Sequence, residues 1–376
     1  MLRTLIRASL LAACFSFQAR ADTFPNDPRF SDQWALAKLN VPTAWNYSFG
    51  STNVKIGVLD SGIVFGTPDL QNRYLTPLVA DTGAPDASAQ VPHGTWVAST
   101  IGMSINNNLG GAGAGNFSIL PINIADSSGI TTDQRIINGI NLAAQNGCRV
   151  ITISYAATSY ANINNAVAAA LTANAAAGRP DFLVVMAGGN SNSFRTLGDP
   201  ALDNAQFRLA ADHLIIVGGT DESDQRWFSD TFTGSDVGPF LDLVAPAHHI
   251  LVANGTDPNL PYGFGSGTSF AAPYVASAAA LAFSINPNLA AAQVQDMLFD
   301  TASNVANPNP GKPYWDQNFG WGRIDFGALA TAAVATVPEP DTLSVLAVGG
   351  LILLSRTRKR RGFADQLSKI PGRYFG

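Results

Sequence analysis

The sequence predicts an α/β fold in which a largely parallel β-sheet is covered by helices. Short apolar runs alternate with longer helix-compatible segments through the middle of the chain, as in sheets whose strands are joined by crossover helices. The 376 residues are 46% hydrophobic and 13% charged, which suits one large globular domain with terminal extensions. No internal repeat interrupts this pattern.

Each predicted element rests on a short stretch of sequence. Clusters of Asn, Gly and Pro, such as 106–115 and 304–312, indicate loops between the elements. The apolar runs expected as strands are 54–59, 119–124, 150–153, 182–186, 214–217 and 241–244. The expected helices are 93–101, 133–145, 162–177, 269–284 and 290–300.

Residues 1–21 have the composition of a secretory leader. Two arginines precede the apolar run 8–17, and residues 19–21 have the A-x-A form of a cleavage site. The run is too short for a membrane helix. An alternative is a bacterial lipoprotein signal, which would lipidate Cys14. Either signal predicts export.

Charge and cysteine content narrow the possible functions. Residues 22–335 carry 24 Asp plus Glu against 12 Lys plus Arg, a formal net charge of −12 that argues against nucleic-acid binding. Cleavage of the leader would leave Cys148 as the only cysteine, so stability must come from the core or from bound ions. Cys148 precedes an apolar run and is expected to fill space in the core.

Three residues have the types and positions that a serine hydrolase needs. Asp60 follows the first expected strand, where parallel sheets collect functional groups, and His93 opens the first expected helix. Ser269 opens an alanine-rich helix, with Pro273 expected in its first turn. Free backbone N–H groups at a helix N-terminus can hold an oxyanion. A nucleophilic serine also needs a base, and the base needs an orienting carboxylate.

The segments Val58-Leu59-Asp60-Ser61-Gly62-Ile63, His93-Gly94-Thr95 and Gly267-Thr268-Ser269 resemble the three motifs of the subtilisin-like serine proteases. The order Asp, His, Ser is also that of the family. The resemblance covers about residues 26–329 and implies a three-layer subtilisin-like fold and a serine endopeptidase. It makes Asp60 the orienting acid, His93 the base and Ser269 the nucleophile. An esterase elbow, Gly-x-Ser-x-Gly, is disfavoured because residue 271 is alanine.

The resemblance also implies residues that bind the substrate. Gly188-Gly189-Asn190 resembles the oxyanion motif of the family, in which Asn190 would donate its side-chain amide to the oxyanion. Ser154-Tyr155-Ala156 resembles the Ser-x-Gly segment that pairs with an extended peptide. Ala156 replaces the usual glycine, and its methyl group either narrows the primary specificity pocket or shifts the bound backbone.

A structural calcium site follows from the same resemblance. Asp69 and the loop 105–111 match a calcium site of the family, and Asn26-Asp27-Pro28 resembles the start of its thermitase-like members. Calcium prefers carboxylate, amide and carbonyl oxygens, which these residues supply. The alternative is a solvated Asn/Gly-rich turn. The expected ligands are Asp27, Asp69, Ile105, Asn107, Leu109 and Gly111.

Residues 336–361 form a separate segment. Pro338-Glu339-Pro340 precedes the apolar run 343–354 and the basic run 356–361, an order that resembles the PEP-CTERM sorting signal of Gram-negative bacteria, which an exosortase processes. The apolar run is short for a full span, so a transient anchor at the inner membrane is expected. Residues 362–376 form an added tail. The stretch 327–337 is expected to be a weakly structured linker to this signal.

Together these features predict an exported, surface-sorted and monomeric peptidase with its catalytic domain at 22–335. It would cleave peptides or proteins through an acyl-enzyme. The alternative is a catalytically silent surface or adhesion protein that keeps the fold. Only residues 22–25 lie between the leader and the thermitase-like start, so no inhibitory folding pro-domain is expected.

Overall fold

The computed structural model describes residues 22–86, 91–155, 160–195, 211–230, 233–255, 260–305 and 315–337. The predictions about the leader 1–21, Ala156 and the segment 338–376 therefore lie outside the described residues. The chain divides into two compact units, Met1–Val334 and Ala335–Gly376, and the sheet and the candidate site lie in the first.

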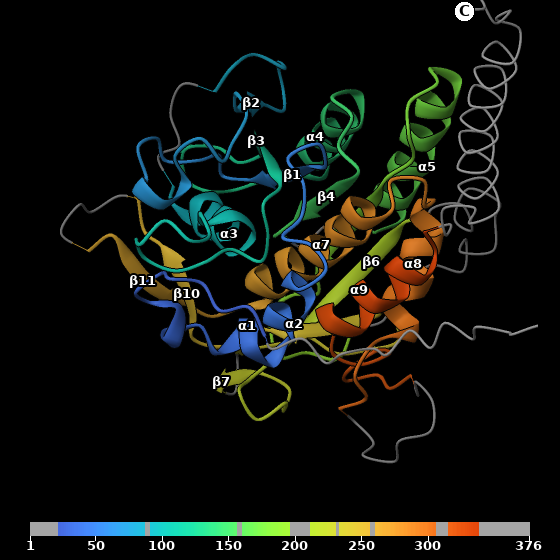
Figure 1. Ribbon diagram of the computed structural model, residues 1–376. Coiled ribbons are helices and arrows are strands. Elements are labelled where there is room, and N and C mark those ends of the chain that lie inside the picture. The colour runs from blue at the N-terminus through green and yellow to red at the C-terminus, as the bar shows by residue number, and fades with distance from the viewer. Residues whose placement is uncertain are drawn as a thin grey trace, which may run out of the picture. The chain divides into compact units, whose positions relative to one another are not determined.

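Among the described residues, a seven-stranded sheet forms the middle of the first unit, and every neighbouring pair of its strands is parallel (Figure 1). All six predicted strands are present, and β2 is an additional short strand at one edge. In sheet order the strands are β2 (Leu78–Val79), β3 (Ser118–Asn123), β1 (Lys55–Asp60), β4 (Val150–Ile153), β5 (Leu183–Ala187), β6 (Leu214–Thr220) and β9 (Leu243–Pro246).

The strands are apolar on both faces because helices cover both sides of the sheet. Successive side chains of a strand point to opposite faces. Val58 and Ile119 accordingly pack in one core cluster, and their neighbours Leu59 and Leu120 pack in the other. The result is the three-layer arrangement that the sequence predicts.

One core cluster holds the helices that carry the candidate catalytic residues. Figure 1 shows α7 against the sheet, with α3 on one side of it and α8 on the other. The helices of this cluster are α1 (Trp34–Lys38), α2 (Val41–Trp45), α3 (His93–Gly102), α7 (Thr268–Ile285), α8 (Ala291–Asp300) and α9 (Phe326–Ala335). The second cluster holds α4 (Asp133–Gln145) and α5 (Tyr160–Ala176).

Helix α7 runs through the core. Its alanines leave room for neighbouring elements to approach closely, and Val275, Leu281 and Phe283 are almost fully buried. Within the described part of the chain it is the one helix with the length and apolar composition of a membrane span, and 89% of that window is buried inside the protein. It is therefore the central helix of the core.

The structure corrects the expected linker at 327–337. Helix α9 occupies most of it, and Asp325 Oδ1 caps the helix by accepting a hydrogen bond from Ala328 N at 2.9 Å. Phe326, Leu329 and Ala333 are buried, and their helical spacing places them on one face. The small residues that suggested a linker are thus the packing surface of a helix.

Several short elements have no counterpart in the prediction. The hairpin of β10 (Ile250–Ala253) and β11 (Tyr262–Gly265) packs beside α3 and leads into α7 (Figure 1). A second short hairpin pairs β7 (Phe228–Asp230) with β8 (Thr233–Gly234). Two turns of 3₁₀ helix lie at Phe30–Asp32 and Pro68–Leu70.

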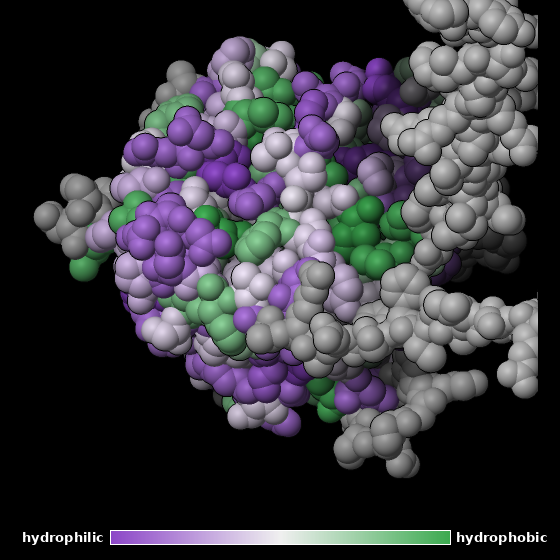
Figure 2. Space-filling view, in the orientation of Figure 1, coloured by the Kyte–Doolittle hydropathy of each residue, from purple (hydrophilic) through white to green (hydrophobic). Residues whose placement is uncertain are grey.

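Cys148 is fully buried against α4 and the sheet, as predicted for a core residue. Burial raises the pKa of its thiol to about 12, so the thiolate that reacts with oxidants and electrophiles is scarce. At the surface, Figure 2 shows mostly purple and pale side chains on the visible face, with green hydrophobic ones in small separate groups. No described part of that face resembles a broad apolar band.

Candidate active site

The carboxyl ends of β1, β4 and β5 meet at one edge of the sheet, because these three strands are parallel neighbours. Asp60 is the last residue of β1. Ser154 and Tyr155 follow β4, and Gly188 and Gly189 follow β5. The predicted acid and the predicted substrate-binding residues, apart from Ala156, therefore lie at this edge.

Asp60 and His93 are in direct contact. His93 Nδ1 lies 2.8 Å from Asp60 Oδ1, which also accepts a hydrogen bond from Ser61 N at 2.7 Å. The Asp60 side chain is buried, whereas that of His93 is 27% exposed. This pairing fixes the orientation of the imidazole and leaves its other face accessible.

The pKa of His93 is set by two opposing influences. Burial favours the neutral imidazole and lowers the pKa, whereas the charge of Asp60 and the hydrogen bond to it favour the imidazolium. The second influence wins, so the pKa lies above the ordinary value of 6.5. A base in this position binds a proton more readily than a free histidine does.

Gly94 allows helix α3 to approach the strand that carries Asp60. A Cβ atom at this position would lie 2.1 Å from the carbonyl oxygen of Gly62 and 3.1 Å from Asp60 Cβ. Backbone atoms cannot yield at that separation, so a side chain here would push the start of α3 away. The glycine after His93 is therefore a requirement of the contact between His93 and Asp60.

Ser269 is the second residue of α7, and reciprocal hydrogen bonds join it to Ser154. Ser269 Oγ donates to the Ser154 carbonyl at 3.3 Å, and Ser154 Oγ donates to the Ser269 carbonyl at 2.9 Å. Among the described residues, Ser269 Oγ makes no hydrogen bond to His93. Phe270 follows Ser269, and Tyr155 follows its partner Ser154; both rings lie near His93. The centroids of the Phe270 and Tyr155 rings are 6.2 and 6.0 Å from the centroid of the imidazole, which places Ser269 close to His93.

Pro273 is inside α7, not in its first turn as the sequence suggests, because the helix starts at Thr268. Proline has no N–H, and the helical partner of residue 273 is the carbonyl of Ser269. That carbonyl is thereby left for the Ser154 hydroxyl. The proline and Ser154 together satisfy the backbone at the predicted nucleophile.

Asn190 is held by Thr268 in one orientation. Its Oδ1 accepts hydrogen bonds from Thr268 N at 2.9 Å and Thr268 Oγ1 at 2.8 Å. Thr268 Oγ1 in turn accepts from Gly189 N at 3.2 Å. With its oxygen fully engaged, Asn190 keeps the Nδ2 group available as a donor beside the start of α7. The N–H of Ser269 belongs to the first turn, where helical N–H groups lack helical partners.

The sequence comparison supports the family that the sequence motifs indicate. A model of the Subtilase family matches residues 51–322. The chain belongs to the Subtilase family. It is a serine endopeptidase of the subtilisin type, and the predicted enzyme class is confirmed.

Relatives of this subtilase support the same assignment. Subtilisin NAT of Bacillus subtilis subsp. natto is 34% identical over 282 residues, covering 73% of this chain and 67% of its own. Subtilisin of Bacillus pumilus is 33% identical over the same length, covering 92% of its own chain. Among solved structures, a protease of Pseudoalteromonas arctica PAMC 21717 aligns with a TM-score of 0.65 and 25% identity, covering 82% of this chain and 99% of its own.

The structure also brings together the predicted calcium residues of this subtilase. Asp27 and Asp69 are buried, and Asn107 Nδ2 donates to Asp69 Oδ1 at 2.8 Å. Burial raises the pKa of Asp69 to about 6; the hydrogen bond from Asn107 lowers it and the charge of Asp27 raises it. Among the described residues no three His, Cys, Asp or Glu form a metal-binding group, so a site here would rest on two carboxylates with amide and carbonyl oxygens. The remaining predicted residues, Ile105, Leu109 and Gly111, belong to the same loop 105–111, and the Gly111 backbone N–H donates to the Asp69 carboxylate, which lowers its pKa.

Two features of the site have no counterpart in the sequence prediction. Thr268 links Gly189 to Asn190, and the only signal for this was a hydroxyl within the Gly-Thr-Ser motif. A polar pocket also lies next to Asp60. The residues that line it are Ser61, Asp86, Val91, Asn123, Ala125, Asp126 and Ser127.

Proposed function

We propose that this subtilase cleaves peptide bonds with Asp60 as orienting acid, His93 as general base, Ser269 as nucleophile and Asn190 as oxyanion donor. The observation that carries the proposal is the 2.8 Å contact of His93 Nδ1 with Asp60 Oδ1 beside the start of α7. A carboxylate only accepts, so the Nδ1 proton faces Asp60 and Nε2 is free to take a proton.

Catalysis begins when the Ser269 hydroxyl turns from the Ser154 carbonyl to His93. His93 takes the hydroxyl proton as Ser269 Oγ attacks the peptide carbonyl, and the imidazolium returns it to the leaving amine. Asn190 Nδ2 and the Ser269 N–H donate to the oxyanion of the tetrahedral intermediate. Water, deprotonated by His93, then hydrolyses the acyl-enzyme.

The substrate is an extended peptide or protein segment. Ser154 and Tyr155 leave the sheet next to Gly188 and Gly189, so backbone groups of these segments that lie beyond the paired strands can bind an extended peptide as an added strand. Ala156 would act on the residue before the cleaved bond, through the size of its pocket or the position of the bound backbone.

Calcium fits the cluster around Asp69, and we propose it as a structural ion. Two buried carboxylates repel each other, and a cation that both coordinate removes this repulsion. Asp27, Asp69 and the Asn107 amide oxygen would hold it, with carbonyl oxygens of Ile105, Leu109 and Gly111. Its role would be to stabilise the loop, at a distance from the reaction.

Export and surface sorting complete the proposal. The leader 1–21 supports secretion, and the Pro-Glu-Pro, apolar and basic runs at 336–361 support a transient membrane anchor processed by an exosortase. The enzyme would act as a monomer. Intact mass of the exported protein from its native host should show loss of the residues after the Pro-Glu-Pro region, and a mass that extends to Gly376 would contradict the sorting role.

The catalytic assignment is tested by Ser269→Ala. A serine-directed phosphonate should label the wild type at Ser269, and the variant should lose casein hydrolysis by about a millionfold, as loss of a nucleophile does. Ser284→Ala, at the other end of α7, is the control and should remain active. Unchanged hydrolysis in Ser269→Ala would refute the assignment. A wild type that neither hydrolyses casein nor takes the label is instead a silent surface protein.

A further inference from the structure

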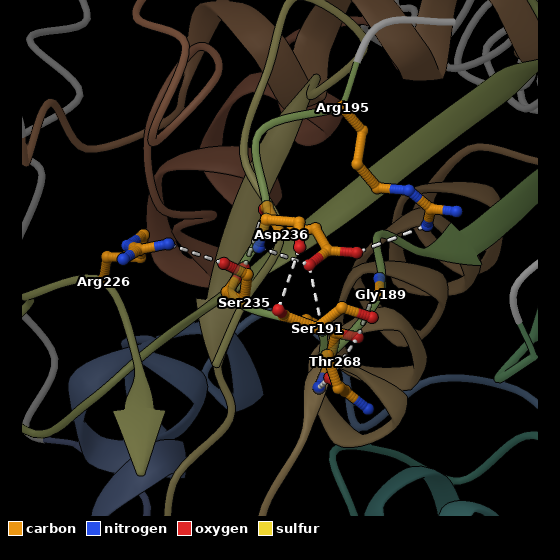
Figure 3. A network of polar contacts seen from close by, with 9 residues as sticks. Gly189, Ser191, Arg195, Arg226, Ser235, Asp236 and Thr268 are labelled. Atoms are coloured by element: carbon orange, nitrogen blue, oxygen red, sulfur yellow. Dashed lines mark hydrogen bonds and ion pairs between the residues drawn. The ribbon is translucent and has the colours of Figure 1, made fainter. Parts of the chain in front are cut away.

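A buried acid outside the catalytic triad lies beneath the loop that carries Asn190. Asp236 follows β8, and none of its surface is exposed. Figure 3 shows its carboxylate between Ser191 and Arg195, with Gly189 and Thr268 close by. A buried carboxylate is costly unless it is fully hydrogen-bonded or paired, so its surroundings indicate what it holds in place.

Asp236 holds the loop on both sides of Asn190. Its Oδ1 accepts hydrogen bonds from Ser191 N at 2.8 Å and Ser193 N at 2.9 Å. Its backbone N–H donates to the Gly189 carbonyl at 3.0 Å. The residues directly before and directly after Asn190 are therefore both bound to Asp236.

The second carboxylate oxygen leaves no room for a side chain at position 189. A Cβ atom there would lie 2.4 Å from Asp236 Oδ2, and Gly189 has a φ of +112°, which favours glycine. Gly189 N also donates to Thr268 Oγ1, which holds the Asn190 amide. Asp236, Gly189, Thr268 and Asn190 thus form one connected group.

Two arginines support this group. Arg195 Nη1 lies 3.3 Å from Asp236 Oδ2, and the Arg195 side chain is 38% exposed. Arg226 donates to the Ser235 carbonyl at 2.9 Å and to Asn192 Oδ1 at 2.7 Å, which joins the β8 segment to the same loop. The charge of Asp236 is therefore paired, and the loop is fixed from two directions.

We infer that Asp236, paired with Arg195, is a positioning residue for the oxyanion donor. It does not touch the substrate; it holds the backbone on both sides of Asn190 so that Nδ2 points to the developing oxyanion before the substrate arrives. This inference rests on the proposed role of Asn190. A preorganised donor acts mainly in the transition state. Loss of Asp236 should therefore lower kcat and leave KM unchanged.

The test is a double-mutant cycle with Asp236→Asn and Asn190→Ala, scored by kcat and KM on a chromogenic peptide. Asn190→Ala alone should lower kcat by about 10²- to 10³-fold with little change in KM. Asp236→Asn keeps an acceptor for Ser191 and Ser193 but loses the charge that pairs with Arg195, and it should lower kcat by about 10-fold or more. In the Asn190→Ala background the same substitution should change kcat by less than about twofold, because residues that act through one another are not additive.

Two further variants keep the test decisive if Asp236→Asn folds poorly. Arg195→Gln changes a partly exposed side chain and should reproduce the fall in kcat, whereas Arg195→Lys should restore part of it. Asp81→Asn is the matched control. Asp81 forms a 2.9 Å ion pair with Arg135 that is not part of this group, so the substitution should leave kcat unchanged.

Equal effects of Asp236→Asn with and without Asn190 would overturn the inference, as would a rise in KM at constant kcat. A different result would contradict the proposed function: Asn190→Ala by itself would leave kcat unchanged. Activity lost only with Asn190→Ala, and not with Asp236→Asn or Arg195→Gln, would refute the positioning role and leave the protease mechanism in place.

Discussion

The raised pKa of His93 predicts how activity depends on pH. The imidazole acts as a base only when neutral, so activity is present above this pKa and is lost as pH falls through it. The acid limb of kcat/KM should therefore lie above pH 6.5. In Asp60→Asn the charge that raises the pKa is gone, so the imidazole should titrate at a lower pH and turnover should fall by about 10⁴-fold.

NMR titration of His93 in the Ser269→Ala protein measures this pKa without interference from turnover. Glu222→Gln is the matched control, because Glu222 pairs with a different histidine, His248, at the surface. It should leave the titration of His93 unchanged. If adding the Asp60→Asn substitution also leaves the titration of His93 unchanged, the assignment of Asp60 as the orienting acid is contradicted.

At the residue scale, the sequence motifs indicate candidates for catalysis but do not indicate the residues that support them. Asp60, His93 and Ser269 stand in motifs that combine local spacing with rare residue types. Thr268 and Asp236 are ordinary polar residues, and their contacts to Asn190 and its neighbours bridge more than forty positions of sequence. Such contacts depend on the order of the strands in the sheet, which the local sequence does not encode.

The close approach of the start of α3 to the end of β1 leads to a prediction about stability and activity. Gly94→Ala places a methyl group against the Gly62 carbonyl, so α3 must shift away from the end of β1. We expect a loss of about 1–3 kcal/mol in unfolding free energy, the usual cost of overpacking, and a fall in kcat as His93 moves from Asp60.

Gly263→Ala is the control for this change, because a Cβ atom at that position of β11 meets nothing within 4 Å. Thermal unfolding and peptide hydrolysis of both variants measure the effect. Equal melting temperatures for Gly94→Ala and the wild type would show that α3 tolerates the shift and that the close approach is not required.

Calcium removal is a second prediction at this scale. Binding to the native state alone adds stability by linkage, so a chelator should lower the melting temperature of the wild type. Asp69→Asn removes the negative charge of a proposed ligand and weakens the site, so a chelator should lower its melting temperature less than that of the wild type. Asp300→Asn, at the exposed end of α8, should respond as the wild type does. If the wild type is insensitive to chelator, the loop 105–111 is a turn without an ion.

The sequence predicts the bounds of a helix or strand closely where its apolar pattern matches the burial of its residues, and poorly elsewhere. β4 and α4 have the predicted bounds, since one is a continuous apolar run and the other an amphipathic helix capped by Thr132. β11 is half glycine, which is poor strand sequence, and its pairing with β10 decides its conformation. The sequence does not predict α9, because its alanines and glycine show that the side chains are small but not that they are buried in a helix.

For the whole molecule, α9 predicts where the catalytic domain can end. A protein of residues 22–335 keeps the helix and should fold and hydrolyse peptides as the full chain does. A protein that stops at Asp325 loses the buried Phe326 and Leu329, each worth about 1.5–3 kcal/mol. That loss is a large part of the stability of a typical domain, about 5–15 kcal/mol. Urea unfolding compares the two, and equal midpoints would show that α9 is dispensable.

The buried thiol of Cys148 allows structural opening of this enzyme to be measured chemically. With the leader removed, Ellman's reagent can reach that thiol only when α4 separates from the sheet, so the rate of colour formation follows that event directly. When reclosing is faster than the chemistry, the rate gives the free energy of opening; when it is slower, the rate gives the opening step itself. Varying the reagent concentration distinguishes the two regimes, without any engineered probe.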